Sequence, residues 1–138
     1  MPIKPENRHR YPADWPAVRE RILKRAGNRC EHPGCTAAQY DFGQWLDGGT
    51  RWLRWGVGAT YTEAKTLAAE ADFASGEEGP KPIVIVLTVA HLNHTPEDVA
   101  DSNLRAWCQR HHLAYDQDHH RANAQATRRA KAGTLELF

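Results

Sequence analysis

Hydrophobic positions near the start of the chain recur at the spacing of an α-helix. Between Asp14 and Ala26 they fall on one face, with Arg and Lys on the other faces. Asp14 can cap such a helix, Pro16 suits its first turn, and Gly27 is placed to end it. We therefore predict a helix over residues 14–26 whose apolar stripe packs in the core: Val18, Ile22, Leu23 and Ala26.

Two aromatic-rich runs follow, at residues 40–46 and 51–55, on either side of a Gly pair. This pattern predicts a β-hairpin that turns over residues 47–50. Three tryptophans lie in the hairpin: Trp45, Trp52 and Trp55. They could stack on nucleic-acid bases, although such residues more often form the core of a hairpin.

The remaining pattern predicts, in order, a helix, a strand, a second strand and a long helix. Residues 62–73 are Ala-rich, with Thr62 as a possible cap, and a polar loop follows at 75–80. The β-branched run after Lys81 favours a β-rich stretch to Leu92. A polar connection then leads to a short strand at 104–107 and to a helix from about Gln109 to Lys131, ending by Gly133.

The length of 138 residues predicts a single α+β domain over residues 1–138. Within it we distinguish a basic arm (1–12), an insertion (36–82) and a core of strand, loop, strand and helix (83–131). The longest apolar run, residues 83–87, is too short to span a bilayer, and the N-terminus lacks the apolar region of a signal peptide. We expect a cytoplasmic protein.

The formal net charge of +1 conceals an uneven distribution. Residues 1–29 carry 8 basic and 3 acidic side chains, residues 63–101 carry 2 and 8, and residues 102–138 carry 6 and 3. If the two basic ends fold side by side they could grip a polyanion. The alternative is that these charges are simply solvated helix faces.

Three cysteines are an odd number in a chain that we expect to be cytosolic, and this favours metal binding over disulfides. Cys30 and Cys35 are separated by four residues, and Cys108 and His111 by two, spacings that are typical of structural zinc. His32 and His112 are substitutes should His111 not be a ligand. Alternatively, the thiols are small buried hydrophobic groups.

Two segments together resemble the HNH endonuclease motif, also called the ββα-metal or His-Me finger. They are LTVAHLNH at 87–94 and DSNLRAWCQRHH at 101–112. The closest similarity is to small phage-associated and bacterial members that carry a zinc knuckle. It covers about 29–35 and 84–121, and its most specific part is Asn103 placed nine residues before His112. The resemblance implies a ββα-metal core stapled by structural zinc, with an N-terminal helix and an inserted hairpin and helix.

The resemblance also assigns roles to three residues. His91 takes the place of the general base, Asn103 positions the backbone around it, and His112 holds a catalytic divalent metal (Mg²⁺, Mn²⁺ or Ni²⁺). These residue types suit phosphodiester cleavage, which needs a base near neutral pKa and a cation to stabilise charge on the phosphate oxygens. Outside the resemblance, His91 would be an ordinary strand-end histidine and Asn103 a turn residue.

Two positions depart from the family pattern. Ala90 stands where an acidic or histidine ligand usually precedes the first His, and His111 stands where the knuckle usually has Cys. Asp116 is our first replacement ligand, because it follows His112 at i+4 on the helix, and His94 is the second. His120 continues the same stripe, with His119 beside it, and the whole stripe could instead be a solvated face.

The predicted partner is DNA, with neither a membrane nor a small-molecule cofactor, and the sequence indicates no particular oligomeric state. DNA contacts are expected from basic residues of the core and the arm: Arg105, Arg110, Arg121, Arg128, Arg129, Lys4, Arg8 and Arg10. No base-reading motif is visible, so weak sequence specificity is expected. The competing hypotheses are a zinc-stapled DNA-binding module that lost catalysis through Ala90, and an interaction domain that docks a partner on the acidic middle segment.

Overall fold

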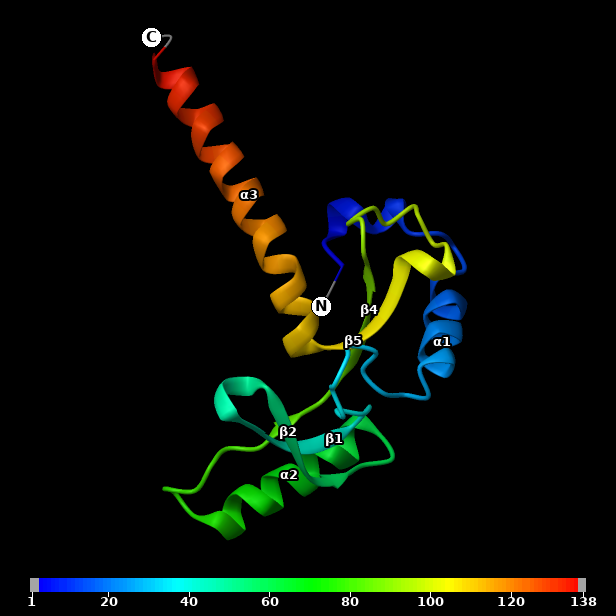
Figure 1. Cartoon of the computed structure of the whole chain (residues 1–138), viewed down its shortest axis with the longest axis vertical. Coiled ribbons are helices and arrows are strands. Elements are labelled where there is room, and N and C mark those ends of the chain that lie inside the picture. The colour runs from blue at the N-terminus through cyan, green and yellow to red at the C-terminus, as the bar shows by residue number, and fades with distance from the viewer. Residues whose placement is uncertain (1–2, 137–138) are drawn as a thin grey trace.

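The computed structural model describes residues 3–136 and shows a mixed α+β fold with two small sheets. In Figure 1, the hairpin and α2 lie at one end, β4, β5 and α1 lie in the middle, and α3 projects from the other end. Residues 1–2 and 137–138 of the predicted domain lie outside the described part. None of the helices described between residues 3 and 136 combines the length and apolar character needed to cross a bilayer.

The N-terminal part contains a 3₁₀ helix, η1 (Pro5–Arg10), followed by α1 (Trp15–Arg25). The α1 bounds agree with the sequence prediction, and Gly27 ends the helix with φ 66°. Asp14 precedes the helix, but its side chain makes no capping hydrogen bond, so that part of the prediction is wrong. The apolar stripe of α1 is buried against β4 and β5, as its spacing predicted.

The insertion forms the predicted hairpin and helix. Strand β1 (Asp41–Leu46) pairs with β2 (Arg51–Val57) across the short η2 (Asp47–Gly49), with a bulge at Phe42 and Gly43. Trp52 is buried in the common core, which favours the core role for this tryptophan. Helix α2 is Tyr61–Ser75. Its cap is Thr60, whose hydroxyl accepts from the Glu63 N–H, and not Thr62 as the sequence suggested.

The β-rich stretch from Lys81 to Leu92 is divided between the two sheets. Strand β3 (Ile83–Val84) pairs with β1, whereas β4 (Leu87–His91) pairs antiparallel with β5 (Leu104–Cys108). Two glutamine side chains satisfy the backbone at the crossing, because Gln109 Oε1 accepts from the Val86 N–H and Gln39 Oε1 from the Leu87 N–H. Backbone amides that leave a ladder in the interior need such partners.

The 3₁₀ turn η3 (Asp101–Asn103) precedes strand β5. Strand β5 leads directly into α3 (Gln109–Glu136). The first turns of α3 pack on β4 and β5, and α1 packs on the same two strands. Figure 1 shows α1 and α3 on either side of this strand pair. The helix continues past Gly133, where we expected it to end. Within residues 3–136, β5 is the only strand that pairs with β4, so no described strand pairs with the other edge of β4.

Candidate functional site

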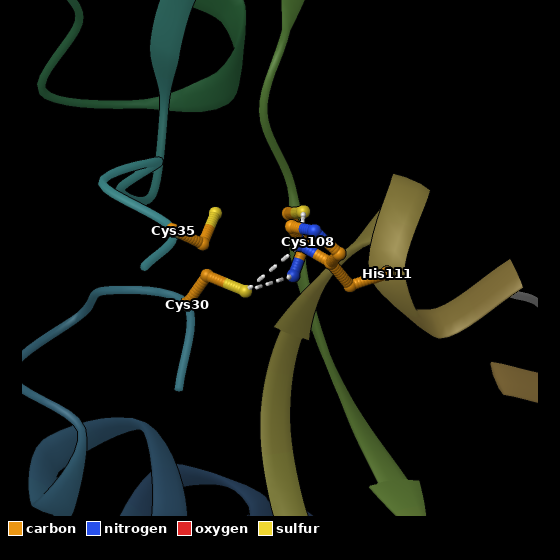
Figure 2. A group of neighbouring side chains, drawn as sticks. All are labelled: Cys30, Cys35, Cys108 and His111. Carbon is orange, nitrogen blue, oxygen red and sulfur yellow. Dashed lines mark hydrogen bonds between the residues drawn. The ribbon is translucent and has the colours of Figure 1, made fainter. Parts of the chain in front are cut away.

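The four predicted metal ligands come together at the junction of the two sheets. Cys30 and Cys35 lie in the loop after α1, Cys108 ends β5, and His111 lies in the first turn of α3 (Figure 2). Their ligand atoms all lie within 4.8 Å of one another. His111 Nδ1 is 3.1 Å from the Cys108 sulfur and 3.6 Å from the Cys30 sulfur. A Cys3His cluster that could bind a metal ion is therefore confirmed.

The electrostatics of this cluster favour a thiolate. Hydrogen bonds from the Cys108 and Cys35 thiols lower the pKa of Cys30, and the negative Cys30 in turn raises the pKa of Cys108. The ring of His32 stacks on His111 with centroids 3.9 Å apart, and so His32 packs beside the cluster and is not one of its four ligands. Three sulfur donors and one imidazole within 4.8 Å of one another form the type of set that zinc takes in structural sites.

The second site is a cavity of about 520 Å³ along β4. Its walls come from α1, α3, the N-terminal segment and the loop after His91. Both His91 and His112 line it, so the two imidazoles predicted to act together share one cavity. The other lining residues are Ile3, Tyr11, Trp15, Arg19, Thr88, Val89, His94, Pro96, Asp116, His119 and His120.

His91 ends β4 and is 8% exposed. Its ring stacks on Trp15 with centroids 5.1 Å apart, and Tyr11 meets it edge-on. Burial lowers the pKa of His91, an effect that the charge of Asp98 opposes. Among the described residues, its buried Nε2 has no hydrogen-bond partner. A neutral imidazole with an unengaged nitrogen has the chemistry of a proton acceptor.

Asn103 binds the loop that follows His91. Its side-chain oxygen accepts from the Asn93 N–H at 3.2 Å, and its amide donates to the Asn93 side chain at 3.0 Å and to the Asp98 carbonyl at 2.9 Å. Its backbone carbonyl accepts from the Leu92 N–H. The geometry is that of a positioning residue, since these side-chain bonds hold the loop that follows His91.

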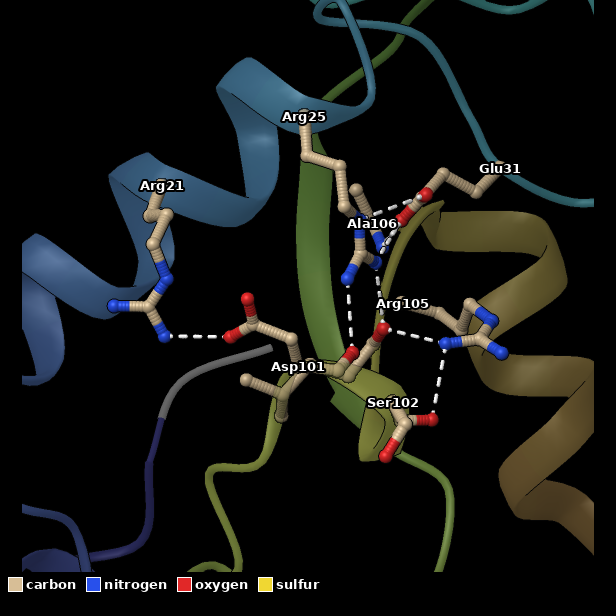
Figure 3. Close-up of polar contacts among 8 residues, drawn as sticks. Arg21, Arg25, Glu31, Asp101, Ser102, Arg105 and Ala106 are labelled. Atoms are coloured by element: carbon tan, nitrogen blue, oxygen red, sulfur yellow. Dashed lines mark hydrogen bonds and ion pairs between the residues drawn. The ribbon is translucent and has the colours of Figure 1, made fainter.

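A charged network fixes the Asn103 turn to α1 (Figure 3). Arg21 pairs with Asp101 at 2.7 Å, and Arg25 donates to the carbonyl of Asp101 at 2.8 Å. Arg25 also pairs with Glu31 at 2.7 Å, and Glu31 accepts from the Ala106 N–H at 2.8 Å. Because Glu31 adjoins Cys30, one network connects the cysteine loop, α1 and the turn that carries Asn103.

His112 and Asp116 lie one helical turn apart on α3, and both side chains line the cavity. His112 Nε2 lies 3.1 Å from Asp116 Oδ2, and Asp116 Oδ1 lies 3.4 Å from His94 Nδ1. Asp116 is 8% exposed, and burial lowers the pKa of both histidines, although Asp116 acts in the opposite direction. The sequence candidates Asp116 and His94 thus adjoin His112. His120 lines the same cavity but is exposed, and His119 stacks on His94.

The Thr88 hydroxyl contacts the other ring nitrogen of His112, Nδ1. The same hydroxyl oxygen lies 3.4 Å from the Trp107 carbonyl oxygen. A hydroxyl has one proton, so His112 has two arrangements. If Thr88 donates to Nδ1, then Nε2–H donates to Asp116 Oδ2 at 3.1 Å; if Thr88 accepts from Nδ1–H, the Nε2 lone pair faces Asp116, and a cation can be bound by both groups.

The predicted DNA-binding arginines have different environments. Arg105 donates to the carbonyls of Ser102 and Leu104, as Figure 3 shows. Arg110 donates to the Gly48 carbonyl and lies over the Trp45 ring, so it joins the hairpin to α3. Three others are exposed on the projecting part of α3: Arg121, Arg128 and Arg129. In the arm, Lys4 and Arg8 are exposed and Arg10 pairs with Glu97 at 2.7 Å.

Sequence reasoning did not single out several side chains of this cavity, among them Tyr11, Trp15, Arg19 and Thr88. The helical pattern placed Arg19 off the apolar stripe, yet it lines the cavity. The one sequence signal for Thr88 is its position three residues before His91, and the HNH-like pattern does not specify that position.

No family model, curated protein or solved structure matches this chain.

Proposed function

We propose that this protein is a metal-dependent DNA endonuclease or nickase, with His91 as general base and a divalent cation bound at His112 and Asp116. The observation that carries the proposal is that His91 and His112 line one cavity although 21 positions separate them in the sequence. The HNH-like pattern of residues 87–112 supports the same interpretation. As in that family, the products would carry 5′-phosphate and 3′-hydroxyl ends.

The Cys3His cluster is proposed to hold structural zinc. Three sulfurs and one imidazole fill a tetrahedral coordination sphere and leave no position for substrate. The bound ion would connect the loop after α1 to the start of α3, and these segments are about 75 residues apart in the sequence. Zinc would thereby fix the helix that carries His112.

The catalytic cation is supported by the charges around Asp116. Among the described residues, no lysine or arginine pairs with the buried Asp116 carboxylate, whose neighbours are His112 and His94. His112 and Asp116 would hold a divalent ion, which would supply positive charge to the phosphate oxygens. One carboxylate and one or two imidazoles suit Mn²⁺ or Ni²⁺ as well as Mg²⁺.

In this mechanism His91 takes a proton from water through its unengaged nitrogen. The low pKa of His91 keeps its ring neutral near pH 7, and stacking on Trp15 fixes the plane of the ring. Asn103 keeps the loop after His91 in place. The exposed arginines of α3 would bind phosphates without reading bases, which agrees with weak sequence preference. We place this activity in the cytoplasm, the host cytoplasm if the gene belongs to a phage.

Plasmid nicking tests the proposal. Supercoiled plasmid is incubated with zinc-loaded protein and Mg²⁺, Mn²⁺ or Ni²⁺, and the open-circular product is followed with time. The wild type is expected to nick, and His91→Ala to lose nicking while it still binds Mn²⁺ and keeps its fold by circular dichroism. Full activity of His91→Ala would refute its role as the base.

The second candidate is a DNA-binding module without catalysis. The observation that favours it is Ala90, which is 1% exposed and packs in the core, so the usual ligand before His91 has no counterpart there. This hypothesis expects salt-dependent DNA binding with no nicking in any of the three metals. A flat salt response would exclude phosphate-driven binding.

A further inference from the structure

Arg19 is the one lysine or arginine among the described residues that line the cavity. It lies on α1, four positions after Trp15, so the two side chains share one face of the helix. His112 and Asp116 come from α3, on the other side of the strand pair (Figure 1). Three residues of β4 line the cavity together with side chains from both helices: Thr88, Val89 and His91.

The guanidinium of Arg19 has unused hydrogen-bonding capacity. Its one hydrogen bond among the described residues goes from Nη2 to the Leu87 carbonyl at 3.3 Å, and it makes no ion pair there. The five N–H donors of an arginine match the geometry of phosphate oxygens, to which it binds in bidentate fashion. A half-buried arginine that makes no ion pair among the described residues, and that lines the same cavity as His91 and His112, is suited to an anion.

We propose that Arg19 binds the scissile phosphate of the substrate, on the cavity wall opposite to His112. This inference rests on the proposed nuclease function and adds to it the residue that touches the reacting group. The Leu87 carbonyl holds the guanidinium beside β4, and the other N–H donors of this cavity-lining side chain have no partner among the described residues. As charge builds up on the phosphate oxygens in the transition state, the fixed guanidinium stabilises it.

The test compares Arg19→Gln, Arg19→Lys and Lys24→Ala in the full-length zinc-loaded protein. Gln keeps a donor for the Leu87 carbonyl and removes the charge, whereas Lys keeps the charge and loses the bidentate geometry. Lys24→Ala is the matched control, since Lys24 is an exposed cation on the same helix. Nicking rates at saturating Mn²⁺ are expected to fall about 10²-fold for Gln, to recover in part for Lys and to stay near wild type for the control.

A binding measurement accompanies the rates. A short fluorescein-labelled duplex is titrated by anisotropy in a His91→Ala background at several salt concentrations. Arg19→Gln is expected to reduce the slope of log Kd against log salt by about one, and Lys24→Ala to leave it unchanged. The midpoint of thermal unfolding of Arg19→Gln should stay within a few degrees of its parent, since the contact with Leu87 is kept.

The outcomes separate the two proposals. If the wild type nicks and Arg19→Gln behaves like Lys24→Ala, the phosphate role of Arg19 is wrong and the nuclease proposal stands. If the wild type nicks with none of the three metals, the nuclease proposal fails. The salt slope then decides whether Arg19 contacts phosphate: an unchanged slope overturns that role, and a reduced slope supports it. Loss of activity matched by loss of thermal stability in both Gln and Lys variants would assign Arg19 a structural role instead.

Discussion

Replacing Thr88 by valine tests whether the His112 tautomer prepares the catalytic cation site. The substitution keeps the shape of the side chain and removes the hydroxyl that is hydrogen-bonded to His112 Nδ1. If the hydroxyl accepts from Nδ1–H when the cation binds, its loss lets the proton move to Nε2, the nitrogen that faces Asp116 at 3.1 Å. A cation would then have to displace a proton before it could bind.

The expected effect is a loss of metal affinity rather than of fold. Removing a hydrogen-bond partner of a ligating histidine weakens binding by about 10- to 100-fold, or about 1.4 to 2.7 kcal/mol. Here we expect a value near tenfold, because burial still restrains the His112 ring: its side chain is only 13% exposed. Stability should change little, since the shape of residue 88 is preserved.

The assay is the Mn²⁺ concentration that gives half-maximal plasmid nicking, with calorimetric titration of Mn²⁺ into the zinc-loaded protein as a second readout. Thr66→Val is the matched control, because the Thr66 hydroxyl donates to the Thr62 carbonyl on the exposed surface of α2. The reasoning is refuted if Thr88→Val and Thr66→Val have the same Mn²⁺ dependence while Asp116→Asn shifts it.

Three further predictions concern stability and pH. Cys108→Ala should remove much of the stability that structural zinc provides, which can approach about 10 kcal/mol, and a melting curve no different from the parent would exclude the zinc proposal. Asp41→Ala should lower the free energy of unfolding by roughly 2 to 4 kcal/mol, as measured in urea, because the buried Trp52 indole N–H and the Ala38 N–H both lose their acceptor. The nicking rate should rise with pH on its acid limb with a midpoint below the ordinary histidine value of about 6.5, since the lowered pKa of His91 leaves the base neutral at lower pH. A midpoint above that value would contradict the burial argument.

Local patterns predicted most of the elements, because each depends on short-range spacing. The α1 stripe, the hairpin and the Cys3His set all follow from residues within a few positions of one another or from familiar ligand spacing. Single residues at element ends were less predictable. Thr60 and Thr62 are both chemically able to cap α2, and only the backbone angles show that Thr60 does so.

The sequence could not predict what depends on contacts between distant segments. The stretch from Lys81 to Leu92 looks like one strand, and the change of sheet at Ile85 is specified by hydrogen bonds to Tyr40 and Asp41, which lie over 40 positions earlier. Arg19 enters the cavity for a similar reason. Its direction depends on how α1 packs against β4, and helical periodicity alone does not determine this.

His111 and His112 are consecutive residues, yet one faces the cysteine cluster and the other faces the cavity. Neighbouring side chains on a helix diverge by about 100°, so a single turn of α3 can serve both places. On the proposed function, acquiring zinc during synthesis would also aim the imidazole needed for cutting. A chain made in a zinc-starved cell would then be unstable and would not cut the chromosome of that cell.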